Sequence, residues 1–369
     1  LVEIARPVGV VGAVTPSTNP IATPLNNTIN AIKGRNSIIL SPSPKGDAVC
    51  ELIVEILQKV LVRLGHPKHL IQKIPSPASK EATNTLMQSV DLVVVTGSEK
   101  NVSSAYRSGT PAIGVGVGNV AVIIDETADL ASAASKVVTS KTFDNATSCS
   151  SENSLVIVDD VYENAIEALQ EEGGVLLDHE ETQELKDNLW IQGKLNPHLI
   201  AKSASEIATV VGFQRPEMKQ AKMLMVEETG TGSEHPFSGE KLSPILTLYR
   251  AENFETACQK IIELYEFQGK GHSVGLHSKD ETRPVEMGLN LPACRVIVNQ
   301  PHCLATGGSF SNGMPFSLSM GCGTWGRNSI SDNLNYRHFL NIVRVVHPVT
   351  SIEPSEEEIF GDFWEKYGR

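Results

Sequence analysis

The sequence Pro7-Val-Gly-Val-Val-Gly-Ala-Val14, followed at once by Thr15-Pro-Ser-Thr-Asn-Pro20, is the clearest indication of the fold class. The first segment is a short apolar run rich in β-branched valine, which is typical of a buried strand. The second segment combines prolines, an asparagine and hydroxyl residues, a pattern that predicts a turn. A helical pattern then runs through Ala31. A strand that leads through a polar turn into a helix is the first part of an α/β unit.

Strands and helices continue to alternate after this unit. Ser37–Leu40 predicts a second buried strand and Asp91–Val95 a third, and Thr96-Gly97-Ser98 then predicts the start of another helix. Between these strands, residues 47–64 place apolar side chains at the spacing of a helix face packed on a sheet: Val49, Leu52, Ile53, Ile56 and Val60. This alternation predicts a parallel, doubly wound sheet.

The pattern starts afresh after Asn119 and predicts a second α/β unit. Its expected elements are a strand at 120–124, a helix at 130–139, a strand at 154–158 and a helix at 161–170. The run from Gly114 to Asn119 is not G-x-G-x-x-G and is expected either near a cofactor or as a tight crossing between two domains. From Leu304 onward Gly, Ser and Asn dominate, and an acidic run with an aromatic tail follows. That tail is expected to cover a partner subunit or its own domain.

Composition excludes several classes of protein. The net charge is −12 and no dense basic tract exists, so neither nucleic acid nor an anionic membrane is expected as a partner. No apolar run is long enough for a membrane span. The six cysteines form no C-x-x-C pair, which disfavours structural zinc, any other metal site and secreted disulfides, and indicates a reducing cytoplasm. The first residue is Leu1 rather than Met, so we expect the chain to be part of a longer protein.

One cysteine differs from the other five in its surroundings. Cys149 lies in Lys141-Thr-Phe-Asp-Asn-Ala-Thr-Ser-Cys-Ser-Ser-Glu-Asn153, among small polar residues that follow a helical run. Hydroxyl and amide neighbours predict that its thiol is held as the nucleophilic thiolate. Cys50, Cys258 and Cys294 are expected to be small buried hydrophobic residues. Cys303 and Cys322 lie in segments expected to be glycine-rich loops and remain candidate second thiols near a site.

Two turns at the expected carboxyl ends of strands contain candidate ligand groups. Thr96-Gly97-Ser98 between a strand and a helix suits a phosphate, because free N–H groups at a helix start point outward and glycine permits close approach. The side-chain amide of Asn19 is a candidate donor to a developing oxyanion. The alternative for both is an ordinary turn without a ligand.

Motifs along the whole chain resemble the CoA-acylating aldehyde dehydrogenases. They occur in one order: Thr15–Pro20, Ser41-Pro-Ser-Pro44, Thr96-Gly97, Gly114–Asn119, Lys141–Asn145 with Cys149, Glu240-Lys-Leu-Ser-Pro244, Gly321-Cys-Gly-Thr-Trp-Gly326 and Asn328-Ser-Ile-Ser331. The resemblance implies an α/β fold of the aldehyde dehydrogenase type, with a Rossmann-type cofactor domain, a second catalytic α/β domain and a small oligomerisation hairpin or tail. It also implies that about a quarter of a typical member, the N-terminal helices, lies outside this sequence.

The resemblance assigns roles and limits to the parts of the chain. Residues 1–118 are expected to form the NAD(P)-binding domain, residues 119–303 the catalytic domain, and residues 304–369 a return segment with an oligomerisation tail. Cys149 falls on the nucleophile and Asn19 on the oxyanion amide. The implied cofactor contacts are Thr15, Ser41, Pro42, Ser43, Thr96, Gly97, Ser98, Gly116, Glu240 and His272. A homodimer or homotetramer in the bacterial cytoplasm, or inside a microcompartment, is expected.

One departure from the hydrolytic relatives favours acyl transfer to CoA. Those enzymes carry a glutamate about 34 residues before the cysteine as the base for water. Here that register falls on Val115, and residues 113–119 contain no acid. A thioester on Cys149 would therefore await the thiolate of CoA, a strong nucleophile in its own right. The alternatives are a hydrolytic enzyme with an acid elsewhere and a non-catalytic assembly protein with the same fold.

Cofactor and substrate are predicted less narrowly. The second strand ends in Ser41-Pro-Ser-Pro-Lys45 with no carboxylate before Asp47, which permits NADP as well as NAD, with Ser43 or Lys45 near the 2′-phosphate. The segments 323–341 and 352–364 resemble the acylating sulfoacetaldehyde dehydrogenases. Sulfoacetaldehyde is therefore the expected substrate, and succinate semialdehyde, acetaldehyde and propionaldehyde are the alternatives. A sulfonate needs a cation or several N–H donors, for which Arg327 and His302 are candidates.

Overall fold

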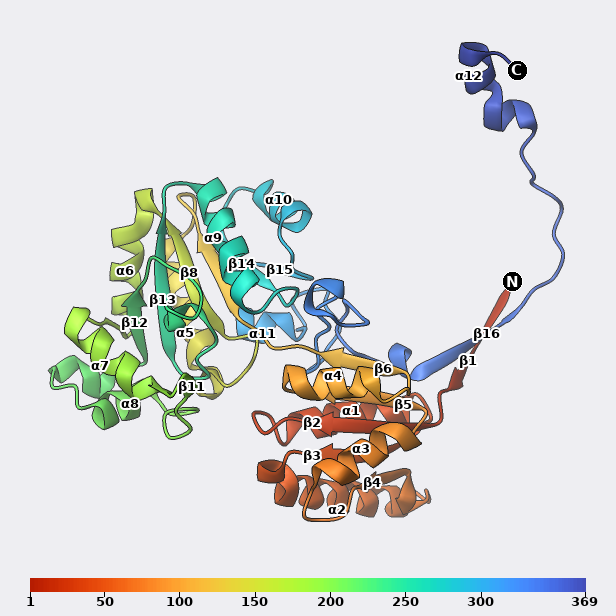
Figure 1. Ribbon diagram of the computed structural model, residues 1–369, viewed down its shortest axis with the longest axis horizontal. Coiled ribbons are helices and arrows are strands. Elements are labelled where there is room, and N and C mark those ends of the chain that lie inside the picture. Colours follow the sequence, from red (N-terminus) through yellow and green to blue (C-terminus); the bar gives the residue numbers. More distant parts are fainter.

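The computed structural model describes residues 1–369, which form two parallel α/β units with a projecting arm (Figure 1). The elements of the first unit are β2 (Val10–Thr15), α1 (Ala22–Lys33), β3 (Ser37–Pro42), α2 (Asp47–Arg63), β4 (Ile71–Lys73), α3 (Lys80–Ser89), β5 (Leu92–Thr96), α4 (Glu99–Arg107) and β6 (Ala112–Val115). Its five strands lie in the order β4-β3-β2-β5-β6, and all pairs are parallel. The predicted doubly wound sheet is confirmed.

The second unit has seven strands. Its elements are β7 (Val120–Ile124), α5 (Leu130–Thr142), β8 (Glu152–Val158), α6 (Tyr162–Glu171), β9 (Gly174–Leu176), α7 (His179–Leu189), β10 (Trp190–Ile191), β11 (Lys194–Leu195), α8 (Ala204–Val211), β12 (Met223–Glu227), β13 (Ile245–Ala251), α9 (Phe254–Phe267), β14 (Val274–His277), α10 (Arg283–Asn290), β15 (Val296–Val298) and α11 (His302–Thr306). The sheet order is β15-β14-β7-β8-β13-β12-β9, again all parallel, and β10 pairs with β11 in a separate two-stranded sheet.

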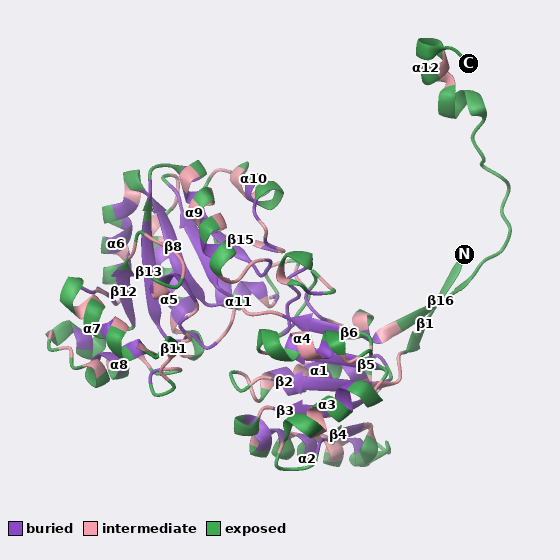
Figure 2. Ribbon diagram, viewed as in Figure 1, coloured by how far each residue is buried: buried purple, intermediate pink, exposed green.

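Both sheets lie at the centre of their units, and their strands are largely apolar runs. Every residue of β7 and β8 is buried, because helices cover both faces of a parallel sheet. Three apolar clusters form in the second unit: one contains α5 and α6, one contains α9, and one contains α7 and α8. Figure 2 shows the strands buried and the outer faces of the helices exposed. The predicted strands and helices of this unit are confirmed, with ends shifted by one to three residues.

Helix α2 is present as predicted, but the predicted buried face is wrong. Leu52 and Ile56 are 58% and 51% exposed, whereas Cys50, Val54 and Leu61 are buried. The helix carries apolar side chains around much of its circumference, so spacing alone did not identify the face. Contacts with β3 and β4 turn Cys50 and Val54 toward the sheet.

A two-stranded antiparallel ribbon projects from the first unit. It pairs β1 (Val2–Pro7) with β16 (Leu340–Val345), and helix α12 (Glu356–Tyr367) lies beyond it at the end of an extended segment (Figure 1). The sequence did not predict β1 or its pairing with a strand more than 330 residues away. The limits 1–118, 119–303 and 304–369 remain a prediction. None of the helices combines the length and hydrophobicity that a bilayer crossing requires.

Candidate active site

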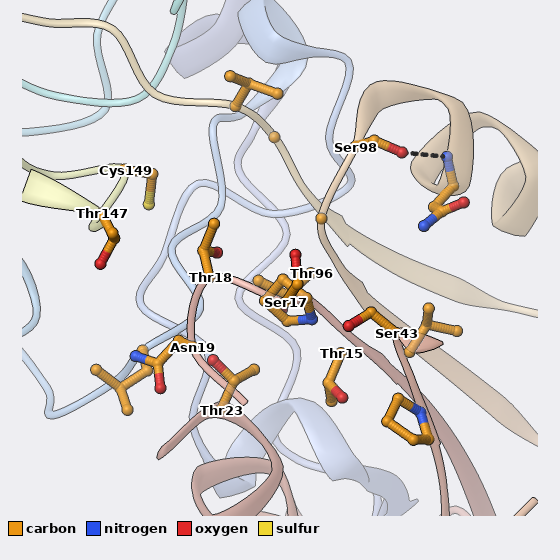
Figure 3. A pocket seen from close by; sticks show the side chains of 18 of the residues that line it. Thr15, Ser17, Thr18, Asn19, Thr23, Ser43, Thr96, Ser98, Thr147 and Cys149 are labelled. Carbon is orange, nitrogen blue, oxygen red and sulfur yellow. Dashed lines mark hydrogen bonds between the residues drawn. The ribbon is translucent and has the colours of Figure 1, made fainter. Parts of the chain in front are cut away.

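A cleft of about 660 Å³ is lined by residues of both α/β units. It includes the turns that follow β2, β3 and β5, and ligands of open parallel sheets bind at such carboxyl ends. The predicted site residues that line the cleft are Thr15, Asn19, Ser41, Pro42, Ser43, Thr96, Gly97, Ser98, Gly116, Cys149 and Glu240. Figure 3 shows Cys149 and Thr147 on one side and Thr15, Asn19, Ser43 and Thr96 on the other. The structure thus gathers residues that are up to 225 positions apart in sequence.

Cys149 is carried by a loop between the 3₁₀ turn Phe143–Ala146 and β8. The residue is half-buried, and its backbone N–H donates no hydrogen bond within the chain. Gly118 lies against the loop: a Cβ at this position would lie 1.9 Å from the carbonyl oxygen of Cys149. Only glycine fits there, so the segment that connects the two sheets also fixes the position of the candidate nucleophile.

Burial raises the pKa of the Cys149 thiol to about 12, and the nearby Glu240 carboxylate raises it further than any other charge. The polar neighbours act weakly in the opposite direction: a hydrogen bond with Ser150 lowers the pKa. The expectation that hydroxyl and amide neighbours hold this thiol as a thiolate is therefore wrong for the ligand-free protein. Desolvation outweighs these hydrogen bonds, and the thiol is protonated at neutral pH.

Asn19 is oriented by the start of α1. Its Oδ1 accepts a hydrogen bond from the Ala22 N–H at 3.0 Å, which leaves Nδ2 as a free donor in the cleft. Figure 3 shows Oδ1 turned toward the helix and Nδ2 turned away from it. The amide of Asn19 and the N–H of Cys149 are two free donors in the cleft, which is the type of group that can stabilise a developing oxyanion.

The first unit supplies groups suited to a nucleotide. Thr15 Oγ1 and Ser43 Oγ are buried without a hydrogen-bond partner, although both residues line the cleft. Gly97 has φ 154°, and the space where its Cβ would be is open apart from Asn101 at 3.9 Å. Ser98 caps helix α4 by accepting a hydrogen bond from the Asn101 N–H at 3.4 Å. An open glycine turn at a capped helix start fits a phosphate group.

Two other predicted cofactor residues have partners within the protein. The hydroxyls of Ser41 and Thr83 lie 2.8 Å apart, and those of Thr96 and Ser319 lie 2.9 Å apart. The second contact joins the end of β5 to a segment more than 200 residues later. These two hydroxyls therefore help to fix the cleft wall through contacts within the protein.

Glu240 is held in the cleft by its neighbours. Its N–H donates to Gln268 Oε1 at 3.0 Å, and the next residue, Lys241, donates from Nζ to the carbonyl oxygens of Asn153, Phe237 and Gly239 at 3.1, 2.7 and 2.9 Å. Burial raises the pKa of Glu240 to about 8, and the ammonium groups of Lys141 and Lys241 oppose that rise. The carboxylate itself has no hydrogen-bond partner in the protein, so it is free to bind a ligand hydroxyl.

Three predicted residues do not reach the cleft. His272 and His302 are buried at 0% and 1% exposure, where Ser273 Oγ bridges them at 2.7 Å to His272 Nδ1 and 2.9 Å to His302 Nε2. Burial lowers the pKa of His272 to about 3, so its ring is neutral. Arg327 is exposed on a loop outside the cleft. Neither His302 nor Arg327 is placed to contact a substrate in this cleft.

The segment that would carry a water-activating acid carries none. Val115 is buried within β6 and does not line the cleft, whereas Gly116 and Val117 do. Gly116 donates its N–H to Asn328 Oδ1 at 3.2 Å. Gly116 and Val117, the residues by which this segment lines the cleft, carry no carboxylate.

No acid at the end of β3 faces the cleft. Asp47, the first carboxylate after this strand, pairs with Lys73 at 2.8 Å, and that hydrogen bond lowers its pKa. Ser43 lines the cleft, whereas Lys45 is exposed outside it. A carboxylate that would repel a 2′-phosphate is therefore absent from this edge.

Sequence reasoning missed much of the cleft wall around Cys149. Cys303 lines the cleft but lies in helix α11, not in a glycine-rich loop as expected. Cys322 lies behind Gly116, with its sulfur 3.5 Å from where a Cβ of Gly116 would be. Other cleft residues without a prior prediction are Ser17, Thr18, Phe143, Asp144, Leu242, Gly307, Ser317, Leu318 and Met320. Gly307, Ser317, Leu318 and Met320 carried no local signal, because only the long-range fold brings them into the cleft with Cys149.

Comparison with known proteins adds an independent finding. The sequence model of the aldehyde dehydrogenase family matches residues 1–178. The chain is 54% identical over 369 residues to an acylating sulfoacetaldehyde dehydrogenase from Cupriavidus necator, covering 100% of this chain and 75% of that protein. It is 41% identical over 363 residues to an acetylating succinate-semialdehyde dehydrogenase from Clostridium kluyveri, covering 98% and 79%.

Solved structures give the same result. An acetylating aldehyde dehydrogenase from Geobacillus thermoglucosidasius superposes with a TM-score of 0.91 at 38% identity, covering 96% of this chain and 78% of that one. A propionaldehyde dehydrogenase from Rhodopseudomonas palustris, solved with CoA and an acylated cysteine, has a TM-score of 0.83 at 27% identity, covering 92% and 75%. An engineered glycolyl-CoA reductase with bound NADP⁺ has a TM-score of 0.84 at 28% identity, covering 92% and 75%.

Proposed function

This chain belongs to the aldehyde dehydrogenase family, in its CoA-acylating branch, and we propose that it oxidises sulfoacetaldehyde to sulfoacetyl-CoA with NADP⁺ through a thioester on Cys149. The observation that carries the proposal is the cleft itself. It contains Cys149 together with two free N–H donors, the backbone N–H of Cys149 and the side-chain amide of Asn19, and its lining residues Gly116 and Val117 carry no acid that could activate water. The 54% identity to the Cupriavidus necator enzyme extends over the whole chain and supports the substrate.

In the proposed reaction, Cys149 loses its proton and its sulfur adds to the aldehyde carbon. Asn19 Nδ2 and the Cys149 N–H donate hydrogen bonds to the oxyanion that forms. The nicotinamide cofactor, when bound, accepts the hydride that leaves this carbon. The carbonyl reforms as a thioester on Cys149, the thiolate of CoA attacks it, and acyl-CoA leaves as the Cys149 thiolate is released. The acyl transfer exchanges one thioester for another of similar energy, so this step is expected to run in both directions.

The first unit is proposed to hold the cofactor. Thr15 Oγ1 and Ser43 Oγ are unpartnered polar groups in its wall, and the Gly97-Ser98 turn offers N–H groups to the pyrophosphate. Glu240 would accept hydrogen bonds from the ribose hydroxyls next to the nicotinamide. Ser43 suits the 2′-phosphate of NADP, since Asp47 is bound to Lys73 and does not repel it.

The sulfonate tail is proposed to be bound by neutral donors. The cations that line the cleft, Lys80 and Lys100, both belong to helices of the first unit, and none lies among the lining residues of the Cys149 side. Hydroxyl and N–H groups of residues such as Ser148 and Leu318 remain available there, because the Leu318 N–H donates no hydrogen bond within the chain. Succinate semialdehyde, which also carries an anionic tail, is the second candidate, supported by the Clostridium kluyveri relative.

A homodimer or homotetramer is proposed as the working form, in the bacterial cytoplasm or in a microcompartment. The β1–β16 ribbon supports assembly, since its apolar side chains Val2, Ile4, Ile342 and Val343 are 43–53% exposed. All six cysteines are free, as expected in a reducing compartment. Sedimentation velocity tests the assembly: a protein that stays monomeric at micromolar concentration contradicts it.

A direct assay tests the proposed reaction. The protein is mixed with sulfoacetaldehyde, CoA and NADP⁺, and the reduced cofactor is followed by absorbance while acyl-CoA is measured by chromatography. Both products should form in equal amounts, and Cys149→Ser should form neither while still binding NADP⁺. Succinate semialdehyde, acetaldehyde and propionaldehyde are compared under the same conditions. Absence of reduced cofactor with all four aldehydes would refute the proposal.

A further inference from the structure

Three buried side chains bracket the loop that carries Cys149. Ser140 and Lys141 lie in the last turn of α5, before the loop, and Glu152 is the first residue of β8, after it. All three are 0% exposed. Burying a carboxylate and an ammonium group costs free energy unless they are paired and hydrogen-bonded. These groups lie at the two ends of the nucleophile loop, where hydrogen bonds between them and to α11 offset this cost.

Three buried hydrogen bonds connect both ends of this loop to helix α11. Ser140 Oγ donates to Glu152 Oε2 at 2.6 Å, and the His302 N–H donates to Glu152 Oε1 at 3.3 Å. The Cys303 N–H donates in turn to Ser140 Oγ at 2.7 Å. One carboxylate and one hydroxyl thus connect the end of α5, the start of β8 and the start of α11. Through Cys303, the same helix reaches the cleft that Cys149 lines.

The charges around Glu152 are balanced within the protein. Burial raises the pKa of Glu152 to about 7, while the bond from Ser140 and the charge of Lys141 lower it. Burial lowers the pKa of Lys141 to about 8, and Glu152 is the strongest of the charges that raise it, ahead of Glu240. Lys141 Nζ has no hydrogen-bond partner, so it acts as a charge rather than as a donor. His302 is neutral, because burial keeps its pKa well below the ordinary value.

We propose that Glu152 is a positioning residue for the reaction of Cys149: its ionised carboxylate holds both ends of the nucleophile loop against the start of α11. The proposal rests on the nucleophile role given to Cys149 above. Both carboxylate oxygens accept a hydrogen bond, and the charge of Lys141 favours the ionised form of the group. Protonation, or replacement by an amide, converts one acceptor into a donor, so the hydrogen bond from Ser140 must be lost or reverse its direction. The loop then shifts relative to Asn19 and Cys303.

Glu152→Gln tests the proposal by pre-steady-state kinetics. The measured quantity is the rate of the first turnover, seen as the burst of reduced cofactor with saturating aldehyde and NADP⁺. A displacement of the sulfur by about 1 Å is expected to slow this burst roughly 10- to 100-fold. The dissociation constant for NADP⁺ should change less than about threefold, since Glu152 does not line the cleft. Glu152→Asp, which keeps the charge, should recover part of the rate.

Asp125→Asn is the matched control. Asp125 is another carboxylate at 0% exposure in the same sheet, where its Oδ1 accepts hydrogen bonds from Thr127, but it follows the far end of β7. This variant should lose stability without a comparable loss of the burst rate. If Glu152→Gln does not fold, Ser140→Ala removes the bonds to Glu152 and to the Cys303 N–H while the carboxylate stays, and a roughly 3- to 10-fold slower burst is expected.

The outcomes separate this proposal from the proposed function. The positioning role is overturned, and the proposed function stays intact, if the burst rate of Glu152→Gln lies within twofold of that of the unaltered protein. If Glu152→Gln does not fold, the same criterion applies to Ser140→Ala. An equal loss of burst rate in Asp125→Asn also overturns the positioning role, because the effect would then follow from stability alone. A missing burst in the unaltered protein refutes the proposed function instead. In the unaltered protein the burst rate should show a further decrease below about pH 7, added to the pH dependence of the Cys149 thiol, and this further decrease should be absent in Glu152→Gln.

Discussion

Alkylation of Cys149 by iodoacetamide is expected to accelerate about tenfold with each unit of pH between roughly pH 7 and pH 9, without reaching a plateau. Only the thiolate reacts, and burial raises the pKa of this thiol to about 12. Its ionised fraction therefore increases in proportion to hydroxide over the whole range. If the thiolate is also the catalytic nucleophile, kcat/KM for the aldehyde should rise with pH over the same range.

The structure sets the size of the effect. A thiol at its ordinary pKa of 9.0 is about one-tenth ionised at pH 8, whereas a thiol with a pKa of about 12 is ionised in roughly one molecule in 10⁴. Cys149 in the ligand-free protein should thus react about 10³-fold more slowly than an unhindered thiol at this pH. The difference corresponds to about 4 kcal/mol of stabilisation of the protonated form.

Mass spectrometry of the peptide that contains Cys149 measures this rate separately from the other thiols. The remaining cysteines are expected to react slowly as well, because burial raises the pKa of each of them. Cys149→Ser gives the background of the assay. A plateau of the alkylation rate below pH 9, or a rate close to that of a free thiol, would contradict a raised pKa of Cys149. It would instead support the thiolate that the polar neighbours predicted.

Three further variants test other parts of the site. Glu240→Gln removes the charge that raises the pKa of Cys149 most, so alkylation at pH 8 should be faster, and an unchanged or slower rate contradicts this. Gly118→Ala places a Cβ against the carbonyl oxygen of Cys149 and should lower kcat about 10²-fold. Gly288→Ala is the control, because the space around Gly288 is open, and its kcat should not change. Equal kcat values for the two variants would contradict the role of the Gly118 contact. Val117→Glu adds a carboxylate to the cleft wall and should allow turnover without CoA, seen as formation of the free carboxylic acid. If this variant forms no free carboxylic acid, the lack of a carboxylate at this wall is not the reason why water fails to react.

Local patterns predicted the fold well where strands are apolar and turns are polar. The segment from Val10 to Pro20 forms a buried strand and an active-site turn, as its valines and prolines indicated. The buried face of α2 was assigned wrongly, because Leu52 and Ile56 have the same hydrophobicity as residues that face the sheet. The ribbon between β1 and β16 had no local signal, since each strand acquires its partner only when the chain returns after the second unit.

The site was predictable from motifs but its electrostatics were not. The cleft contains Cys149, Asn19 and Glu240, as the resemblance implied. The protonation state of the thiol depends on burial by residues far apart in sequence, which no neighbouring residue reveals. His302 and Arg327 were chosen by loop position, and the structure places one in a buried helix and the other on the surface. The bonds between Glu152 and α11 likewise exist only through long-range packing.

The central claim is that a thioester forms on Cys149 and persists until a thiol attacks it. A first turnover without CoA tests this claim most directly. Protein at known concentration is mixed with saturating sulfoacetaldehyde and NADP⁺, and the reduced cofactor is counted per protein chain. The account predicts close to one equivalent, then a halt, then renewed turnover when CoA is added. Continued formation of reduced cofactor without CoA would show that water releases the acyl group, and it would contradict the cleft wall at Gly116 and Val117 as the reason for acyl transfer.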